Sequence, residues 1–131
     1  MGVLAPLFAL IAPFIVWPIE FLLPYPYVVE EIVKGFLVYL LLDVKETSTK
    51  IKTAIAVGVL FSFSETVLYL FNFFAVGYLP FFFKRLLYTV PLHVITVLVI
   101  LFPALKDKRL IVVGVILSGV LHFLYNKFIA Y

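Results

Sequence analysis

Val29-Glu30-Glu31-Ile32-Val33-Lys34 places three charged side chains within sequence that is otherwise hydrophobic. The run Gly35-Phe36-Leu37-Val38-Tyr39-Leu40-Leu41-Leu42 follows directly. A single Asp, Lys or Arg at the centre of a membrane helix costs about 2.5–3.5 kcal/mol, so charges kept together there must pair, contact water or take part in chemistry. On a helix, Lys34 lies four residues after Glu30 and three after Glu31, within one turn of both carboxylates.

The composition is that of a membrane protein. Of the 131 residues, 66% are hydrophobic, 18% aromatic and 13% charged. A soluble domain of this length cannot bury so much apolar surface, so lipid has to be the solvent. The absence of cysteine excludes disulfides, thiolate zinc sites and cysteine nucleophiles. The net charge of +3 lies in short connections, where it indicates membrane orientation, and we expect no nucleic-acid partner.

The hydrophobic runs predict an all-α protein, a single transmembrane domain over residues 1–131 with five membrane-spanning helices in a bundle. No alternating pattern typical of a membrane β-barrel occurs. We expect Pro6, Pro13 and Pro18 to bend the first helix and Pro26 to occupy the first turn of the second. The expected helices cover about residues 3–23, 27–42, 51–74, 84–105 and 110–131.

Small residues mark two helix faces for close contact. Ala54, Gly58 and Ser62 recur at four-residue steps, and Gly114 and Ser118 do so in the last helix. Such faces serve packing within one chain or a homodimer, and the sequence leaves both interpretations open.

The segment from Ala75 to Phe83 is too apolar for an aqueous loop and is interrupted by Gly77 and Pro80. We expect it to lie in the membrane interface. It is either a mobile gate through which substrate enters from the bilayer or a static aromatic belt.

The basic residues predict a multi-pass integral protein of the cell membrane with a cytoplasmic N-terminus and an external C-terminus, by the positive-inside rule. The side predicted to be cytoplasmic carries Lys45, Lys50, Lys52, Lys106, Lys108 and Arg109. The other side carries Lys84, Arg85 and Lys127.

Ionisable residues on four of the predicted helices fall at a similar depth. Glu65, His93 and His122 each lie nine residues from the predicted outer end of their helix, about 13 Å at 1.5 Å per residue. Glu30 and Glu31 lie a few residues shallower. We therefore expect one polar cavity that opens toward the outer face.

Each group also has an interpretation without function. Glu30, Glu31 and Lys34 can form an interfacial helix cap, a single histidine can join two helices by a hydrogen bond, and Arg85 can snorkel to the interface. Glu65 has no basic residue within a helical turn, and intramembrane carboxylates are functional by default. Their occurrence together at one depth favours a functional site.

The chemistry that suits these residues is hydrolysis. Cleavage of a peptide bond needs an activated water, a group that stabilises the oxyanion and a proton donor for the amine. Ser62 and Ser64 flank Glu65, but no Ser-Lys or Gly-x-Ser-x-Gly context supports a serine nucleophile. A carboxylate acting on water fits better, because two close carboxylates share a proton, so that one accepts while the other donates.

The ordered motifs resemble a known family. They are Glu30-Glu31-x-x-Lys34, Phe61-x-x-x-Glu65, Arg85 followed by His93, and His122-x-x-x-Asn126. In this order they resemble the motif series of the PrsW intramembrane proteases, relatives of the CAAX prenyl endopeptidases and of the wider CPBP group. The resemblance covers about residues 28–128. Lys34 agrees with the PrsW version, whereas the CAAX branch has an arginine one residue later and a histidine at the position of Glu65. The chain is also shorter than is usual for the family.

The resemblance implies an intramembrane endopeptidase that acts on a membrane-protein or lipidated-peptide substrate. It implies Glu30 as the principal base, Glu65 as its helper, and His122 with Asn126 as oxyanion donors. Glu31 remains an alternative base.

Two further site residues have less definite roles. Glu31 can be structural and hold Lys34 or Arg85. His93 can bind the water, a metal or the oxyanion, and the sequence does not decide among them.

Zinc is the alternative to metal-free hydrolysis, since histidines and carboxylates bind it. We favour an enzyme without a cofactor, because no His-Glu-x-x-His motif occurs and the ligands come from different helices. If zinc is bound, its expected ligands are Glu30, Glu65, His93 and His122. Two other functions are a non-catalytic scaffold, since relatives include a scaffold subunit of gamma-secretase, and a small proton or cation carrier, since Glu and His chains can relay protons.

Overall fold

The computed structural model describes residues 1–72 and 79–129, and within them the regular elements are all helices. In chain order they are η1 Gly2–Leu4, α1 Ala5–Leu22, α2 Pro26–Leu41, α3 Thr47–Asn72, α4 Leu79–Lys106, η2 Lys108–Leu110 and α5 Ile111–Phe128. The prediction of an all-α fold is confirmed.

Four helical stretches of the described residues are long and apolar enough to cross a membrane. They are Gly2–Leu22, Thr47–Phe71, Leu79–Lys106 and Lys108–Phe128. α2 is shorter: its 16 residues extend about 24 Å, less than the roughly 30 Å of a hydrocarbon core. The predicted span over residues 27–42 is therefore a helix, but it is not one of these four.

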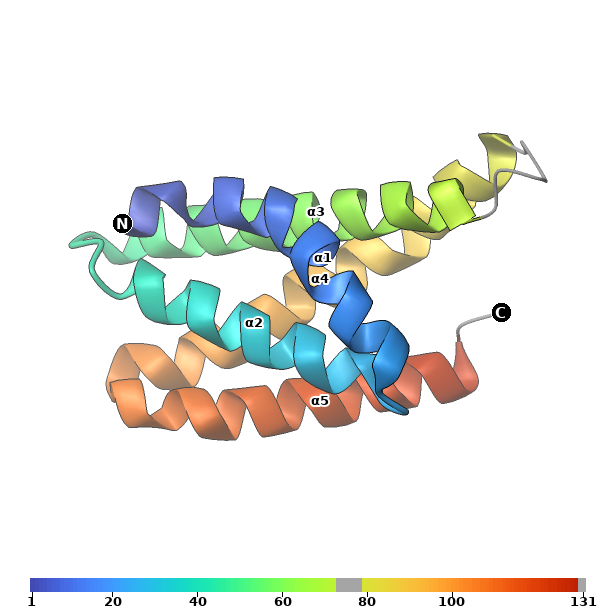
Figure 1. Ribbon diagram of the computed structural model, residues 1–131. Helices are drawn as coiled ribbons and strands as arrows, with labels where there is room; N and C mark the ends of the chain where they lie inside the picture. The colour runs from blue at the N-terminus through green and yellow to red at the C-terminus, as the bar shows by residue number, and fades with distance from the viewer. Residues whose placement is uncertain (73–78, 130–131) are drawn as a thin grey trace.

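The helices form one bundle in which α4 is central. Figure 1 shows α2 and α5 side by side, α1 beside α3, and α4 running diagonally between these two groups. α4 packs against α2, α3 and α5, and α1 packs against α2 and α3. The start of α2, the end of α3, the start of α4 and the end of α5 lie toward the same end of the bundle (Figure 1).

Proline shapes α1 as expected, with one exception. Pro13 and Pro18 lie inside the helix, where each removes a backbone hydrogen bond. Figure 1 shows α1 changing direction between the half beside α3 and the half that crosses toward the start of α2. Pro6 instead lies in the first turn, where the missing N–H leaves no helical bond unmade.

α2 has its polar residues inside and its apolar residues outside. Glu30, Glu31 and Lys34 are buried on the face that continues through Leu37 and Val38. The opposite face is exposed and apolar, with Ile32, Phe36 and Tyr39. A helix of this kind needs lipid or another hydrophobic surface on its outer face and pairs its charges within the bundle.

The small-residue faces pack within the chain. A Cβ added at Gly58 of α3 would lie 2.6 Å from Cα of Val94 in α4, and one added at Gly114 of α5 would lie 2.6 Å from Cα of Ile100. Ser118, the next member of the α5 face, is fully buried. Glycine is required at these two contacts because backbone occupies the space of a side chain.

The boundaries of α4 and α3 differ from those expected. α4 begins at Leu79, five residues before the predicted start at residue 84, and so includes most of the segment expected as an interfacial loop. Pro80 does not prevent this, since proline suits the first turn of a helix. α3 begins at Thr47, four residues early. The predicted gate covered Ala75 to Phe83, and its first part, residues 75–78, lies outside the described residues.

Gly58→Ala should destabilise the protein, because the new methyl group meets the α4 backbone, which cannot move aside as a side chain can. Overpacking of this kind typically costs about 1–3 kcal/mol. Thermal unfolding in detergent should show a lower Tm. Gly119→Ala in α5 is the matched control, since its added Cβ would meet no atom of a neighbouring described residue within 4 Å. Equal Tm values for the two variants would contradict the close α3–α4 contact.

Candidate active site

Lys34 is completely buried and has three partners. Its Nζ donates to Oε1 of Glu31 at 2.6 Å and to the hydroxyl of Thr96 at 3.1 Å. The ring of Phe61 lies with its centroid 5.2 Å from the ammonium, within the range of a cation–π contact. Of the two carboxylates that helical spacing places near Lys34, the ammonium therefore pairs with Glu31.

His122 connects this pair to α5. Its Nδ1 lies 2.8 Å from Oε1 of Glu31, the same oxygen that accepts from Lys34, and 3.7 Å from Oε2 of Glu30. The ring of Tyr27 lies 5.8 Å from the His122 ring and restricts its orientation. Glu31 is thus held by a cation of its own helix and by an imidazole of α5.

Glu65 of α3 is held by two side chains of α4. Nη2 of Arg85 donates to Oε1 at 2.8 Å, and Nε2 of His93 lies 2.6 Å from Oε2. The guanidinium carbon of Arg85 lies 3.5 Å from the centroid of the Tyr69 ring. Arg85 is therefore a buried partner of Glu65, and the interpretation that it snorkels is wrong. Glu31 holds Lys34 and not Arg85.

The two charged groups meet at the two histidines, with Glu30 between them. The rings of His93 and His122 lie 5.6 Å apart at an angle of 89°. Ligand atoms of Glu30 lie within 4.8 Å of those of Glu65 and His93, and also within 4.8 Å of those of Glu31 and His122. The expected proximity of Glu30 to both Glu65 and His122 is found.

Glu30 differs from the other two carboxylates. Its Oε2 is buried without a hydrogen bond to any described residue, as is Oε2 of Glu31, but among the described residues Glu30 has no Lys or Arg at ion-pair distance. Glu31 pairs with Lys34 and Glu65 with Arg85. With ionised carboxylates and neutral histidines, three negative and two positive charges leave one excess negative charge. That charge belongs to Glu30, because the two cations already have partners.

A cavity of about 360 Å³ joins these residues. Six of the eight predicted site residues line it: Glu30, Glu65, Arg85, His93, His122 and Asn126. Asn126 is exposed at its rim, one helical turn after His122. Glu31 and Lys34 do not line the cavity and instead support it from behind. The volume is enough for several waters or for a water and part of a peptide, since one water occupies about 30 Å³ in the liquid.

The residues expected at one depth meet in the structure, but they do not lie equally far from the ends of their helices. His93 lies 14 residues after Leu79, the first residue of α4, whereas Glu65 lies 7 residues before Asn72 and His122 lies 6 before Phe128. The count of nine residues was wrong for His93 because α4 begins earlier and crosses the bundle diagonally (Figure 1).

Sequence reasoning missed several residues of the site. Tyr69 lies under Arg85, and Thr96 accepts from Lys34. Both had a signal in the sequence, because Tyr69 follows Glu65 by four residues and Thr96 follows His93 by three, and such spacings put residues on one helix face.

Glu20, near the end of α1, is a further carboxylate that sequence reasoning did not single out. It is only partly exposed, and its buried Oε1 makes no hydrogen bond with a described residue.

The comparison with known families identifies the chain. The family described as "PrsW family intramembrane metalloprotease" matches residues 15–131. The chain therefore belongs to the PrsW family of intramembrane proteases and is a multi-pass integral membrane protein. No curated protein and no solved structure matches it.

The family description names a metalloprotease, so we ask whether the carboxylates and histidines of the site could bind a metal ion. Carboxylate oxygens and imidazole nitrogens are ligands that zinc takes, with three protein ligands in catalytic sites. Glu30, Glu65 and His93 bring three such atoms within 4.8 Å of one another, and the unbonded Oε2 of Glu30 offers a free donor. These residues fit one divalent ion. His122 belongs to a separate group with Glu30 and Glu31, so the four predicted ligands do not form one set.

Lys34→Met should destabilise the protein strongly, because it leaves the buried carboxylate of Glu31 without its cation. Breaking a buried ion pair typically costs about 3–5 kcal/mol. The double variant Lys34→Met/Glu31→Gln should recover much of the lost stability, since it removes both charges. Thermal unfolding of the three proteins measures this. A double variant no more stable than Lys34→Met alone would contradict the pairing.

Proposed function

We propose that this protein is an endopeptidase that hydrolyses a peptide bond of a membrane-protein or lipidated-peptide substrate, with a water activated by Glu30. One observation carries the assignment of the base: Glu30 is the buried carboxylate of the cavity that has no cation of its own. Membership of the PrsW family supports the reaction type.

The surrounding pairs leave Glu30 as the better base. A carboxylate that already accepts hydrogen bonds from a cation is a weaker proton acceptor, because those bonds stabilise its charged form. Glu31 accepts from Lys34 and contacts His122, and Glu65 accepts from Arg85. Glu31 is therefore assigned a positioning role, and Glu65 holds His93.

The proposed reaction needs one water and one proton acceptor. Glu30 takes a proton from the water as its oxygen attacks the peptide carbonyl, which forms the C–O bond and the tetrahedral oxyanion. The C–N bond then breaks, and the proton held by Glu30 passes to the leaving amine. A pocket with little bulk water strengthens this catalysis, because the charges act in a low dielectric.

Oxyanion stabilisation is assigned to Asn126 and to His122 in its protonated form. The amide of Asn126 always has two N–H donors. When Nδ1 of neutral His122 donates to Glu31, its Nε2 is an acceptor, so the ring becomes a second donor only after it takes up a proton.

A bound divalent metal is the second mechanism that the site accommodates. Held by Glu30, Glu65 and His93, it would supply Lewis-acid polarisation of the carbonyl. We favour hydrolysis by the carboxylate alone, because Arg85 already pairs with one oxygen of Glu65 and repels a second cation at that group.

Glu30→Gln keeps the shape of the side chain and removes the proton acceptor, so it should abolish cleavage of a labelled transmembrane peptide in phosphatidylcholine vesicles. General bases typically contribute about 10²–10⁴-fold to the rate. Glu46→Gln is the control, because Glu46 is exposed and lies far from the cavity. The hydroxyls of Ser48 and Thr49 donate to its carboxylate and lower its pKa, so this variant also removes an ionised carboxylate.

Three outcomes would contradict this proposal. Undiminished cleavage by Glu30→Gln would mean that another group is the base. Loss of wild-type cleavage in a chelator, restored by zinc, would establish the metal mechanism in place of the carboxylate one. Absence of cleavage by the wild-type protein would favour a scaffold over an enzyme.

The proposal includes five membrane spans, with a cytoplasmic N-terminus. The exposed apolar face of α2 supports its contact with lipid, and local thinning of the bilayer can accommodate a short helix. Because the chain has no cysteine, single introduced cysteines report topology. Lys45→Cys and Lys108→Cys should react with an impermeant thiol reagent only from the cytoplasmic side. Labelling from opposite sides would contradict this topology.

A further inference from the structure

α2 and α5 leave an apolar groove between them on the outside of the bundle. One stretch of about 580 Å³ reaches from Tyr25 and Phe123 to Ile116, and a second of about 480 Å³ continues from Ile116 to Lys108. The two stretches share lining residues and form one channel, here called the α2–α5 groove. From Ile111 to Phe123 it extends about 18 Å along α5, more than half of a hydrocarbon core.

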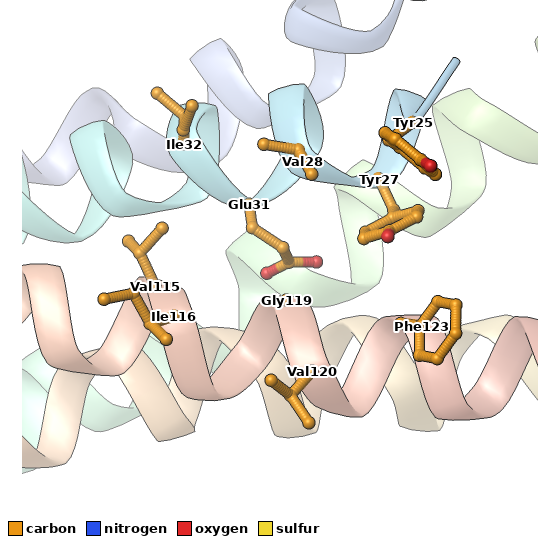
Figure 2. A pocket seen from close by; sticks show the side chains of 10 residues that line it. All are labelled: Tyr25, Tyr27, Val28, Glu31, Ile32, Val115, Ile116, Gly119, Val120 and Phe123. Carbon is orange, nitrogen blue, oxygen red and sulfur yellow. The ribbon is translucent and has the colours of Figure 1, made fainter.

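The stretch of the groove next to the site contains one charged residue. Figure 2 shows the apolar side chains of Val28 and Ile32 on α2 and of Val115 and Val120 on α5 around this stretch. The carboxylate of Glu31 points from α2 toward α5 in the same view. The wall is therefore suited to an apolar occupant and carries a carboxylate of the site.

Gly119 lines the stretch of the groove next to the site, and its environment differs from that of the other helical glycines, including Gly35 in the second stretch. A Cβ added at Gly35, Gly58 or Gly114 would lie 2.6 Å from an atom of a neighbouring helix. At Gly119 it would meet nothing within 4 Å. The missing side chain of Gly119 thus serves no packing within the described chain. Small residues on membrane helices allow the backbone of another helix to approach closely.

The groove and the active-site cavity share a wall. Tyr27 lines both of them. Glu31 lines the groove, and its carboxylate contacts His122, which lines the cavity. An occupant of the groove therefore lies one side chain away from the reacting groups.

We propose that the α2–α5 groove docks the hydrophobic transmembrane helix of a protein substrate, beside the cavity in which its unwound end is cleaved. This inference rests on the proposed function and names the route by which a substrate reaches it. A helix fits the groove better than a lipid acyl chain does. The open space over Gly119 allows the backbone of a helix to approach closely, whereas a thin acyl chain would not fill that space. A second copy of the protein fits less well, because a copy bound there would exclude a substrate from the wall that the groove shares with the cavity.

Disulfide cross-linking tests the groove directly, since the chain has no cysteine of its own. Val120→Cys and Val113→Cys are a matched pair on α5, with the valines 51% and 45% exposed, and only Val120 lines the groove. Each variant also carries Glu30→Gln, which prevents cleavage. The probe is a leucine-rich helical peptide of about 20 residues with one central cysteine, in phosphatidylcholine vesicles.

We expect several-fold more peptide adduct at Val120→Cys than at Val113→Cys. Gly119→Leu should reduce the adduct several-fold by filling the groove, whereas Leu117→Phe on the lipid-facing side of α5 should leave it unchanged. Equal adducts at the two cysteines would overturn the proposal. So would a dominant homodimer adduct at Val120→Cys, which assigns the groove to a second copy, or an adduct unaffected by Gly119→Leu.

The result is separable from the proposed function, because cross-linking needs no catalysis. Selective adduct formation without wild-type cleavage would overturn the protease assignment and keep the groove. Cleavage without selective adduct formation would overturn the groove alone. In the active protein, Gly119→Leu should raise KM for the peptide and leave kcat nearly unchanged. This is expected of a residue that contributes equally to binding in the ground state and in the transition state.

Discussion

A charge inside an apolar bundle needs an opposite charge beside it, and this requirement fixes how α2, α3, α4 and α5 are aligned. Lys34 meets it through Glu31, which also contacts His122 of α5. Arg85 meets it through Glu65, which is on a different helix. A shift of α3 or α4 by one residue rotates its side chains by about 100° and would leave Arg85 and Glu65 unpaired. A shift of α2 or α5 would instead break the contact between Glu31 and His122. The contacts of the charged residues thus fix the axial register of the helices.

The close backbone contacts of the bundle serve this same arrangement. Gly58 lets α3 approach α4 at Val94, directly after His93, and its missing Cβ position lies only 3.0 Å from the carbonyl carbon of His93. The side chain of His93 then reaches Glu65, which lies two turns further along α3. The apolar core fills the other end of the bundle, where Leu41, Ala54 and Leu101 pack. The apolar end of the bundle holds the helices together, and this packing aligns the polar groups at the other end.

Much of this could be read from the sequence, because it depends on properties of single helices. Composition identified the membrane, and helical spacing placed Lys34 beside Glu31 and His122 beside Asn126. Partners from different helices could not be predicted in the same way. Arg85 and Glu65 are 20 residues apart, and their pairing depends on where α4 begins and how it crosses α3. The groove had no sequence signal, because apolar residues that face lipid and those that face a partner have the same composition.

Glu31 lies where the groove and the cavity meet, and from this position it orients His122. Its carboxylate fixes Nδ1 of His122 and so decides which ring nitrogen faces the cavity. The Glu31 side chain is only 1% exposed, so a helix seated in the groove would pack against a carboxylate that is already out of water. Its hydrogen bonds with Lys34 and His122 therefore act in a low dielectric before any substrate is present. The folded bundle itself aligns His122, and a helix docked in the groove would lie beside an oxyanion donor that is already positioned.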